Sequence, residues 1–426
     1  MNYIQSVKDQ YENYPYPPRN ESDLLLSSTD ILERVNHYLF KGKQTFVGFR
    51  ALVAGCGTGD SVVWLGLQLK PLNGKVVAID ISEASLDICR KRVKYFGLDN
   101  ITFLNMSLLD LPVSGFEQFD YINCIGVLHH LSNPTEGLKA LKSVLKPEGG
   151  MGLMVYGKYG RLGIYNMQDA MRLINRNIID PQKKVDNVKD ILSNLPPRNW
   201  FQFQKTWFND AATDNGLYDM FLHSNDIPFT VDGVYEMVEA CDMHIVEFDN
   251  AHRYKLEYSP HAHLIQHLSQ REKYHLAELL MGTMYKHVLY ISNIKNSVAT
   301  ISDDIIPYFP IQIENKKIVS SLRSLIEKGY MSATIGLQHP CGDAIQLTLV
   351  LGKYLPDILE KIDGNTTIKD IFSEIDAPRN ILADIFIRMY KLFNDFSMML
   401  LRDISSPKLD YIATYDLHNP SGIILA

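Results

Sequence analysis

The chain has 426 residues, of which 46% are hydrophobic and 21% charged, and this composition excludes disordered and fibrous proteins. At this length we expect two or three structural units rather than a single core. The net charge of −7 makes nucleic acid an unlikely partner, because nucleic acid binds basic surfaces. No apolar signal segment opens the chain and no uncharged run is long enough to span a membrane, so we expect a cytoplasmic protein.

The N-terminal residues 1–48 are expected to form an arm and a helix. Prolines in Tyr11-Glu-Asn-Tyr-Pro-Tyr-Pro-Pro-Arg19 predict an extended, turn-like segment that carries aromatic rings. Such a segment is either an arm docked on the surface or a lid on a ligand cleft. Residues 28–40 then read as a capped helix.

A regular alternation of strands and helices occupies residues 49–156. Strands separated by helices predict an α/β fold with a parallel, doubly wound sheet. The expected strands are 50–54, 75–80, 101–105, 119–125 and 150–156, and the expected helices are about 60–70, 83–96 and 134–146.

The rest of the chain divides into three parts. Residues 157–228, with an aromatic cluster from Trp200 to Phe208, are interpreted as an insertion over the cleft. Residues 229–294 complete the sheet, with helices at 230–241 and about 262–281 and strands at 243–248 and 284–292. In residues 295–426 we expect two short strands within 301–320. Three helices and a strand within 353–402 then form the outline of a winged-helix module.

Metal chemistry finds little support in the sequence. The five cysteines are scattered without a CxxC pair, which predicts neither a zinc site nor a disulfide framework. His263 and His267, close to His261, have the i, i+4 spacing of a helical metal pair, but no carboxylate follows in a matching pattern. We therefore expect no metal.

The glycine-rich stretch after the first strand predicts a cofactor site. Gly55, Gly57 and Gly59 let the backbone adopt positive φ and let a ligand approach it closely. Asp80 ends the next strand, where a carboxylate can bind both hydroxyls of a ribose. The stretch lacks the GxGxxG pattern of dinucleotide sites and the Lys-Ser/Thr of a P-loop, so it predicts a nucleoside cofactor without a pyrophosphate.

Three segments together identify a family resemblance. Val53-Ala-Gly-Cys-Gly-Thr-Gly59 resembles motif I of class I S-adenosylmethionine-dependent methyltransferases. Phe119-Asp-Tyr-Ile-Asn-Cys-Ile-Gly-Val-Leu-His-His-Leu131 is similar to their strand-four motif, and Leu145-Lys-Pro-Glu-Gly-Gly150 to the turn before strand five.

The resemblance implies a seven-stranded Rossmann-like sheet and S-adenosyl-L-methionine as the cofactor. Two positions depart from the family pattern, since Ala54 stands for the usual acid and Ser107 for the usual aspartate of the adenine motif. The implied cofactor-binding residues are Gly55, Cys56, Gly57, Gly59, Asp80, Ile81, Ser107, Leu108, Cys124, Ile125 and Gly126.

A narrower resemblance concerns the substrate. The Tyr-Pro segment of the arm, residues 155–161, residues 219–223 and the C-terminal module resemble rickettsial-type protein lysine methyltransferases. This implies methylation of lysine side chains on a protein, such as a bacterial surface protein. A small-molecule O- or N-methyltransferase, a cofactor-binding regulatory protein that lacks catalysis, and a homodimeric assembly stay open.

The candidate catalytic residues follow from the chemistry of an amine acceptor. A lysine amine has a pKa near 10.4 and must lose its proton to act as a nucleophile. Carboxylate, imidazole and phenol groups near the ends of the fourth and fifth strands, on the arm and in the insertion are therefore the candidates. They are Tyr16, His129, Tyr156, Asp219 and His223.

Overall fold

The computed structural model describes residues 3–25, 27–203, 210–259, 262–310, 315–338 and 344–409. The chain forms two compact units. The first comprises Met1–Leu24, Val47–Phe248 and Tyr254–Ile294, and the second comprises Leu25–Phe46, Asp249–Arg253 and Lys295–Ala426. All the candidate site residues belong to the first unit, and the five-part division of the chain stays a prediction.

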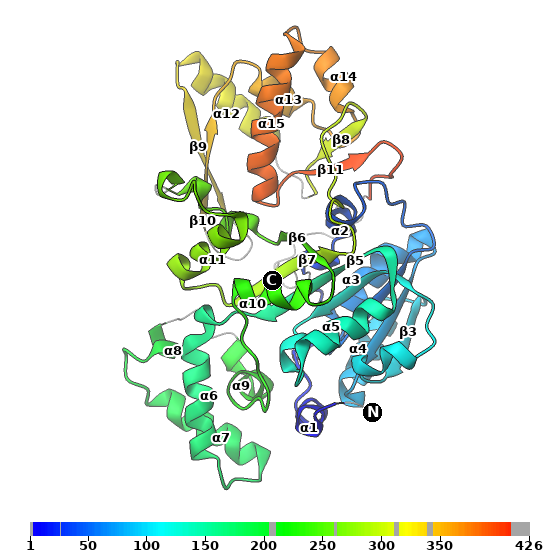
Figure 1. The fold of residues 1–426 in the computed structure, drawn as a ribbon, viewed down its shortest axis with the longest axis vertical. Helices are drawn as coiled ribbons and strands as arrows, with labels where there is room; N and C mark the ends of the chain where they lie inside the picture. The colour runs from blue at the N-terminus through cyan, green and yellow to red at the C-terminus, as the bar shows by residue number, and fades with distance from the viewer. Residues whose placement is uncertain are drawn as a thin grey trace. The chain divides into compact units, whose positions relative to one another are not determined.

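A seven-stranded sheet is the framework of the first unit (Figure 1), which confirms the predicted Rossmann-like α/β fold. Its strand order is β3-β2-β1-β4-β5-β7-β6. Strands β1 to β5 run parallel, whereas β7 is antiparallel to both β5 and β6, so the sheet is mixed rather than wholly parallel. The strands are β1 Arg50–Ala54, β2 Lys75–Asp80, β3 Ile101–Asn105, β4 Phe119–Ile125, β5 Leu145–Tyr156, β6 His244–Phe248 and β7 Lys286–Ser292.

The direction of the strand order reverses between β1 and β4. Val53 of β1 lies opposite Ala78 of β2 on one side and Asn123 of β4 on the other. Their carboxyl ends therefore meet at one edge of the sheet. In open α/β sheets, ligands bind in the crevice at such a reversal.

Helices connect the strands in the manner that right-handed crossovers require. The crossovers β1 to β2 and β4 to β5 lead toward opposite edges of the sheet, so their helices lie on opposite faces. Helices α3 and α4 contact each other, as do α5 with α10 and α10 with α11. Their bounds are α3 Asp60–Leu69, α4 Glu83–Tyr95, α5 Pro134–Ser143, α10 Val231–Glu239 and α11 Gln270–Met281.

The insertion is a helical cluster with a small core of its own (Figure 1). Side chains such as Ile164, Met171, Val188 and Phe221 form this core, and Phe201 joins them from the predicted aromatic cluster. Trp207 and Phe208 lie outside the described residues. The helices are α6 Leu162–Ile174, α7 Pro181–Ser193, α8 Trp200–Phe203 and α9 Asp214–Phe221.

The N-terminal arm differs from its prediction at its start. Helix α1, Gln5–Asn13, includes the first residues of the segment that the prolines predicted to be extended. The helix ends at Asn13, two residues before Pro15, since a residue that precedes proline is disfavoured in helical conformation. Only the part that follows the helix is therefore extended.

One further prediction was wrong. The long helix predicted over 262–281 begins only at Gln270, because Ser269 and Glu272 form a capping box that starts α11 there. His263 and His267 are therefore not neighbours on one α-helix, and His261 lies outside the described residues. Within 301–320 the described residues include the strand β8 Ile305–Tyr308 and the start of a helix at Asn315, and the second predicted strand stays a prediction because 311–314 lie outside the described residues.

The second unit contains the predicted three helices followed by a strand. Strand β11 pairs with β8, and β9 with β10, each antiparallel. One hydrophobic core includes Ile358, Ile371, Phe386 and Leu401. The winged-helix interpretation stays a prediction. The remaining elements are α2 Leu32–Leu39, α12 Asn315–Glu327, β9 Ser332–Gln338, β10 Ala344–Val350, α13 Leu355–Glu360, α14 Ile368–Ser373, α15 Arg379–Asp395 and β11 Leu400–Asp403.

Among the described residues, none of the helices has the length and apolar character needed to cross a bilayer.

Candidate active site

The glycine loop between β1 and α3 has the backbone that the sequence predicts. Gly55, Gly57 and Gly59 have φ of 71°, 50° and 98°. A Cβ on Gly59 would lie 2.3 Å from Sγ of Cys89, so only glycine fits there. The loop therefore offers bare backbone at the sheet edge where the strand order reverses.

Asp80, the last residue of β2, is hydrogen-bonded to the glycine loop. Its Oδ2 accepts a hydrogen bond from N–H of Gly57 at 2.8 Å, and its Oδ1 accepts one from N–H of Ser82 at 2.9 Å. Burial raises the pKa of Asp80, and these N–H donors act against that rise. Each carboxylate oxygen keeps a second lone pair for a ligand hydroxyl. The bare loop and this carboxylate fit the ribose of a nucleoside cofactor.

The other predicted cofactor residues lie at the same edge or just behind it. Ser107 accepts a hydrogen bond from N–H of Leu109 at 3.2 Å and so caps the short helix Leu108–Val113. Cys124 is fully buried in the sheet core, which raises its pKa to about 12, and Gly126 follows β4 with φ of 78°. Contacts of Ser107, Cys124 and Gly126 with a cofactor stay predictions. The same holds for the other four residues, Cys56, Ile81, Leu108 and Ile125.

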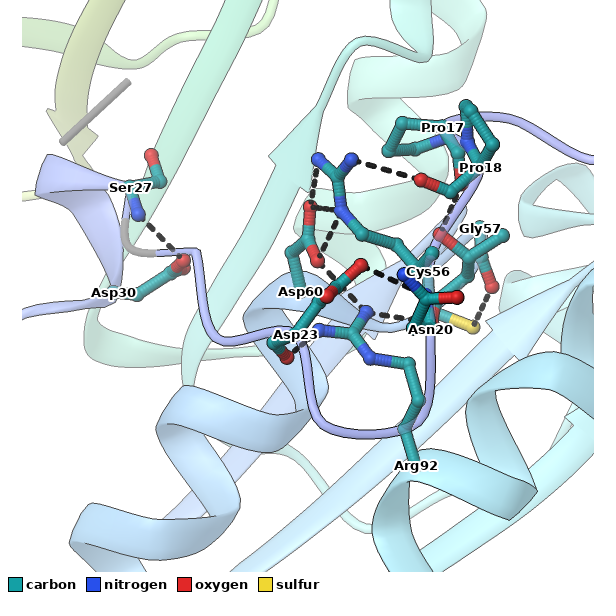
Figure 2. Close-up of polar contacts among 12 residues, drawn as sticks. Pro17, Pro18, Asn20, Asp23, Ser27, Asp30, Cys56, Gly57, Asp60 and Arg92 are labelled. Atoms are coloured by element: carbon teal, nitrogen blue, oxygen red, sulfur yellow. Dashed lines mark hydrogen bonds and ion pairs between the residues drawn. The ribbon is translucent and has the colours of Figure 1, made fainter. Parts of the chain in front are cut away.

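The arm docks on the glycine loop. Thr58 donates a hydrogen bond from Oγ1 to the carbonyl of Pro17 at 2.8 Å, and Arg19 pairs with Asp60 at 2.8 Å. Asp60 also accepts from the buried Arg92 of α4 at 2.7 Å, as Figure 2 shows. The start of α3 is thereby tied to the arm on one side and to α4 on the other.

A second set of contacts joins the arm to the loop that follows β2. The carboxylate of Glu12 accepts from N–H of Glu83 and of Ala84, both at 3.0 Å, at the start of α4. Ser82 donates from Oγ to the carbonyl of Tyr11 at 3.0 Å. The arm is therefore docked over both loops that carry the predicted cofactor residues.

A polar cluster lies where the arm, β5 and α9 meet. Tyr11 donates to Oδ1 of Asp219 at 3.0 Å, and Tyr156, the last residue of β5, donates to Oδ2 at 3.4 Å. Asp219 is 5% exposed, and burial raises its pKa. The guanidinium of Arg161 lies 3.6 Å from the centre of the Tyr156 ring. One buried carboxylate thus accepts hydrogen bonds from two phenol hydroxyls.

Three histidines line the same cluster. His129 packs its ring against Tyr156 at 3.9 Å, and His130 stacks on His223 at 3.7 Å between ring centres. Burial lowers the pKa of His129 and of His223 well below the usual value, so both rings are neutral at pH 7. Within the described structure, neither ring nitrogen of His129 has a hydrogen-bond partner.

The backbone of Tyr16 lies beside the glycine loop. A Cβ on Gly57 would lie 3.0 Å from the carbonyl oxygen of Tyr16. The phenol of Tyr16 adds to the rise in the pKa of Tyr156, which burial dominates. Tyr16 therefore stands between the cofactor loop and the polar cluster, and its catalytic role stays a prediction.

Asp219 and His223 are four residues apart in the sequence but are joined through a third residue. Helix α9 ends at Phe221, so His223 lies beyond the helix and the two residues share no helical face. Tyr11 joins them instead, since its hydroxyl is 3.0 Å from Asp219 and 3.3 Å from Nε2 of His223. Sequence analysis recognised the aromatic arm but selected Tyr16 and missed Tyr11.

Two groups of side chains lie close enough together to offer ligand atoms to a metal ion. His130, Asp219 and His223 each offer an atom within 4.8 Å of the other two, as do His129, His130 and Asp226. Nδ1 of His223, however, accepts from N–H of Asn225 at 3.1 Å, which puts the proton of the neutral ring on Nε2, toward Tyr11. His223 is therefore a hydrogen-bond donor to Tyr11, and the prediction that no metal binds stays a prediction.

Comparisons with known proteins agree with this geometry. Residues 52–151 match the family model of a methyltransferase domain. An uncharacterized protein of Synechococcus is 32% identical over 288 residues, which are 65% of this chain and 68% of that protein. Demethylmenaquinone methyltransferase of Lactococcus lactis is 30% identical over 174 residues, 40% of this chain and 64% of that enzyme.

A solved structure resembles the whole fold. PKMT2 from Rickettsia typhi, in complex with AdoHcy, matches with a TM-score of 0.62 over 91% of this chain and 77% of that chain. The sequence identity is 16%, so the likeness is one of fold.

Proposed function

The chain belongs to the class I S-adenosylmethionine-dependent methyltransferases, and we propose that it transfers the methyl group to lysine side chains of a protein substrate. S-adenosylmethionine is its cofactor and supplies an electrophilic methyl group on a sulfonium. The glycine loop and Asp80 are proposed to hold the nucleoside. Positioning and exclusion of water are the main demands of such a transfer.

The observation that carries the proposal is the buried carboxylate of Asp219 beside two phenol hydroxyls. A lysine arrives as a cation and must give up a proton before or during methyl transfer. A carboxylate whose pKa is raised by burial is a better proton acceptor than an exposed one. The neighbouring His129 and His223 are neutral, so they do not repel the incoming cation.

The insertion supports a protein as the acceptor. Its helices and loops expose large apolar side chains, with Leu173 66%, Ile179 91% and Trp200 59% exposed. Contiguous apolar patches mark surfaces that a partner covers, and we propose that these side chains belong to the surface that a protein substrate contacts. The fold likeness to PKMT2 from Rickettsia typhi also favours this class of acceptor.

A small-molecule acceptor is the second candidate. The similarity to demethylmenaquinone methyltransferase of Lactococcus lactis supports it, although that similarity covers 40% of this chain.

The proposal is tested by intact-mass analysis of lysine-rich bacterial surface proteins after incubation with the enzyme and S-adenosylmethionine. We expect mass increments of one or more methyl groups. The matched control uses the same proteins with their lysines acetylated beforehand, which should stay unmodified. Methylation that is equal before and after acetylation would contradict lysine as the acceptor.

A further inference from the structure

We propose that Tyr11 is a positioning residue for methyl transfer, whose hydroxyl holds Asp219 as the group that receives the proton of the acceptor amine. This inference rests on the proposed function, because it concerns the same site. It adds a residue from the arm, more than 200 positions distant in sequence from the carboxylate that it contacts.

The hydrogen bonds fix the direction of the Tyr11 hydroxyl. N–H of Asn225 donates to Nδ1 of His223, so the proton of the neutral ring is on Nε2. Nε2 lies 3.3 Å from the hydroxyl oxygen of Tyr11 and donates to it. The hydroxyl proton of Tyr11 is then free to point to Oδ1 of Asp219 at 3.0 Å. The chain of hydrogen bonds therefore runs from His223 through Tyr11 to the carboxylate of Asp219.

The position of Tyr11 itself is set from the cofactor side. Its carbonyl accepts from Oγ of Ser82, and N–H of Ser82 donates to Asp80. The neighbouring Glu12 binds the first N–H groups of α4. One helical turn of the arm therefore links the predicted ribose carboxylate to the predicted proton acceptor.

The methyl-transfer step balances with this assignment. The lone pair of the amine nitrogen forms the new N–C bond while the S–C bond breaks, and sulfur keeps that electron pair as a neutral thioether. The proton from the amine passes to the carboxylate of Asp219. A carboxylate held by a donor on one oxygen presents the lone pairs of the other in a fixed direction. The longer 3.4 Å contact of Tyr156 marks Oδ2 as the oxygen that is less firmly held.

Several groups besides Tyr11 act on the charge of Asp219. Burial is the largest influence and raises its pKa, and Asp226 adds to the rise. Three groups lower its pKa, namely His130, Arg161 on the neighbouring short helix and the hydrogen bond from Tyr11. Loss of the Tyr11 hydroxyl therefore raises the pKa of Asp219 further, while the other groups stay in place.

The test compares the pH dependence of kcat in the full-length wild type, Tyr11→Phe and Tyr14→Phe, with poly-L-lysine as the probe. We expect the acidic limb of Tyr11→Phe to move to higher pH by about one to two units, the range that a hydrogen bond to a charged group accounts for. Tyr14 is the matched control, because it is on the same arm, stacks on Tyr218 and donates an exposed 3.4 Å hydrogen bond from its hydroxyl to Gln182. Its removal should leave the limb in place.

A second variant guards against a folding defect. Replacing Tyr11 by 3-fluorotyrosine keeps the ring and makes the hydroxyl a stronger donor, so the acidic limb should move to lower pH. Opposite shifts in the two variants support the proposal. An unmoved limb in both variants, or an equal shift in Tyr14→Phe, overturns it.

A measurement without an acceptor separates this inference from the proposed function. The carboxyl carbon of Asp219, assigned with Asp219→Asn, is titrated by carbon-13 NMR in the complex with S-adenosylhomocysteine. A higher pKa in Tyr11→Phe supports the role of Tyr11 even where the wild type methylates no amine probe, a result that would contradict only the proposed function. An unchanged pKa of Asp219 overturns the inference.

Discussion

Asp80 is the residue on which we expect cofactor binding to depend most. Asp80→Ala should lower the affinity for S-adenosylhomocysteine by about 1.5 to 3 kcal/mol, because hydrogen bonds from the ribose to a charged group are lost. Isothermal titration calorimetry measures this change. Asp99→Ala is the control, since Asp99 is an exposed partner of Lys70. Equal affinities of Asp80→Ala and the wild type would refute the ribose assignment.

Asp219 is the residue that we propose for proton transfer from the acceptor. Asp219→Asn keeps the shape of the side chain but cannot take a proton, so kcat should fall by about 10²- to 10⁴-fold with little change in cofactor affinity. The control is Asp214→Asn on the same helix, where Asp214 pairs with the exposed Lys189. Similar kcat values for the two variants would exclude Asp219 as the proton acceptor.

The cofactor side of the site was easier to predict from the sequence than the cluster around Asp219. Gly55, Gly57, Gly59 and Asp80 lie within one strand-loop-helix-strand unit, where local spacing reflects local geometry. The contact of Tyr11 with Asp219 closes over more than 200 residues, and no local period encodes it. Asp219 and His223 are only four residues apart, yet they do not share a helix, because α9 ends between them.

At the scale of elements, the arm should matter more for activity than for stability. Helix α1 buries only Val7 and Gln10, and the arm is otherwise held by hydrogen bonds and an ion pair, so deleting residues 1–20 should lower stability by a smaller factor than turnover. The same deletion removes the hydrogen bond from Tyr11 to Asp219 and exposes the glycine loop on which the arm docks. We therefore expect kcat to fall steeply. Turnover and melting temperature measured on the same preparation check this. A large loss of melting temperature with a proportionate loss of turnover would indicate a docked arm with a purely structural role.

In the second unit, His37 of α2 should make stability depend on pH. Its Nδ1 lies 3.0 Å from N of Leu401 in β11, and burial lowers its pKa to about 4. The unfolded chain, with a histidine pKa near 6.5, binds the proton first as the pH falls. The free energy of unfolding should therefore drop by about 3 kcal/mol between pH 6.5 and pH 4.

Urea unfolding at several pH values measures this effect as a difference between the wild type and His37→Gln. The pH dependence should be weaker in the variant, since the titrating ring is absent. Parallel curves for the two proteins would show that His37 does not control this part of the acid sensitivity.

The elements themselves were predictable where a pattern was regular. The strands of the sheet follow from apolar runs between helices, and the predicted strand segments from Arg50 to Ser292 are present. The helix predicted over 262–281 failed because the capping box at Ser269 and Glu272 starts α11 late. Apolar spacing alone does not show where a helix begins when a strong cap interrupts it.

For the whole molecule, the order of strands was easier to anticipate than the identity of the acceptor. Right-handed crossovers limit the topology, and the reversal between β1 and β4 then places the cofactor edge. The proposed acceptor site is instead assembled from the arm, the ends of β4 and β5 and the insertion, which meet only in the folded chain. We therefore propose that acceptor specificity resides in these added segments rather than in the sheet.

The most direct test of the proposed function lets protein and small-molecule acceptors compete in one vessel. The enzyme is incubated with methyl-labelled S-adenosylmethionine and a bacterial extract, and the label is then separated by size and mapped by tandem mass spectrometry. We predict that the label is on the Nε atoms of protein lysines and that Asp219→Asn removes it while Asp214→Asn does not. Label confined to the small-molecule fraction would contradict the account.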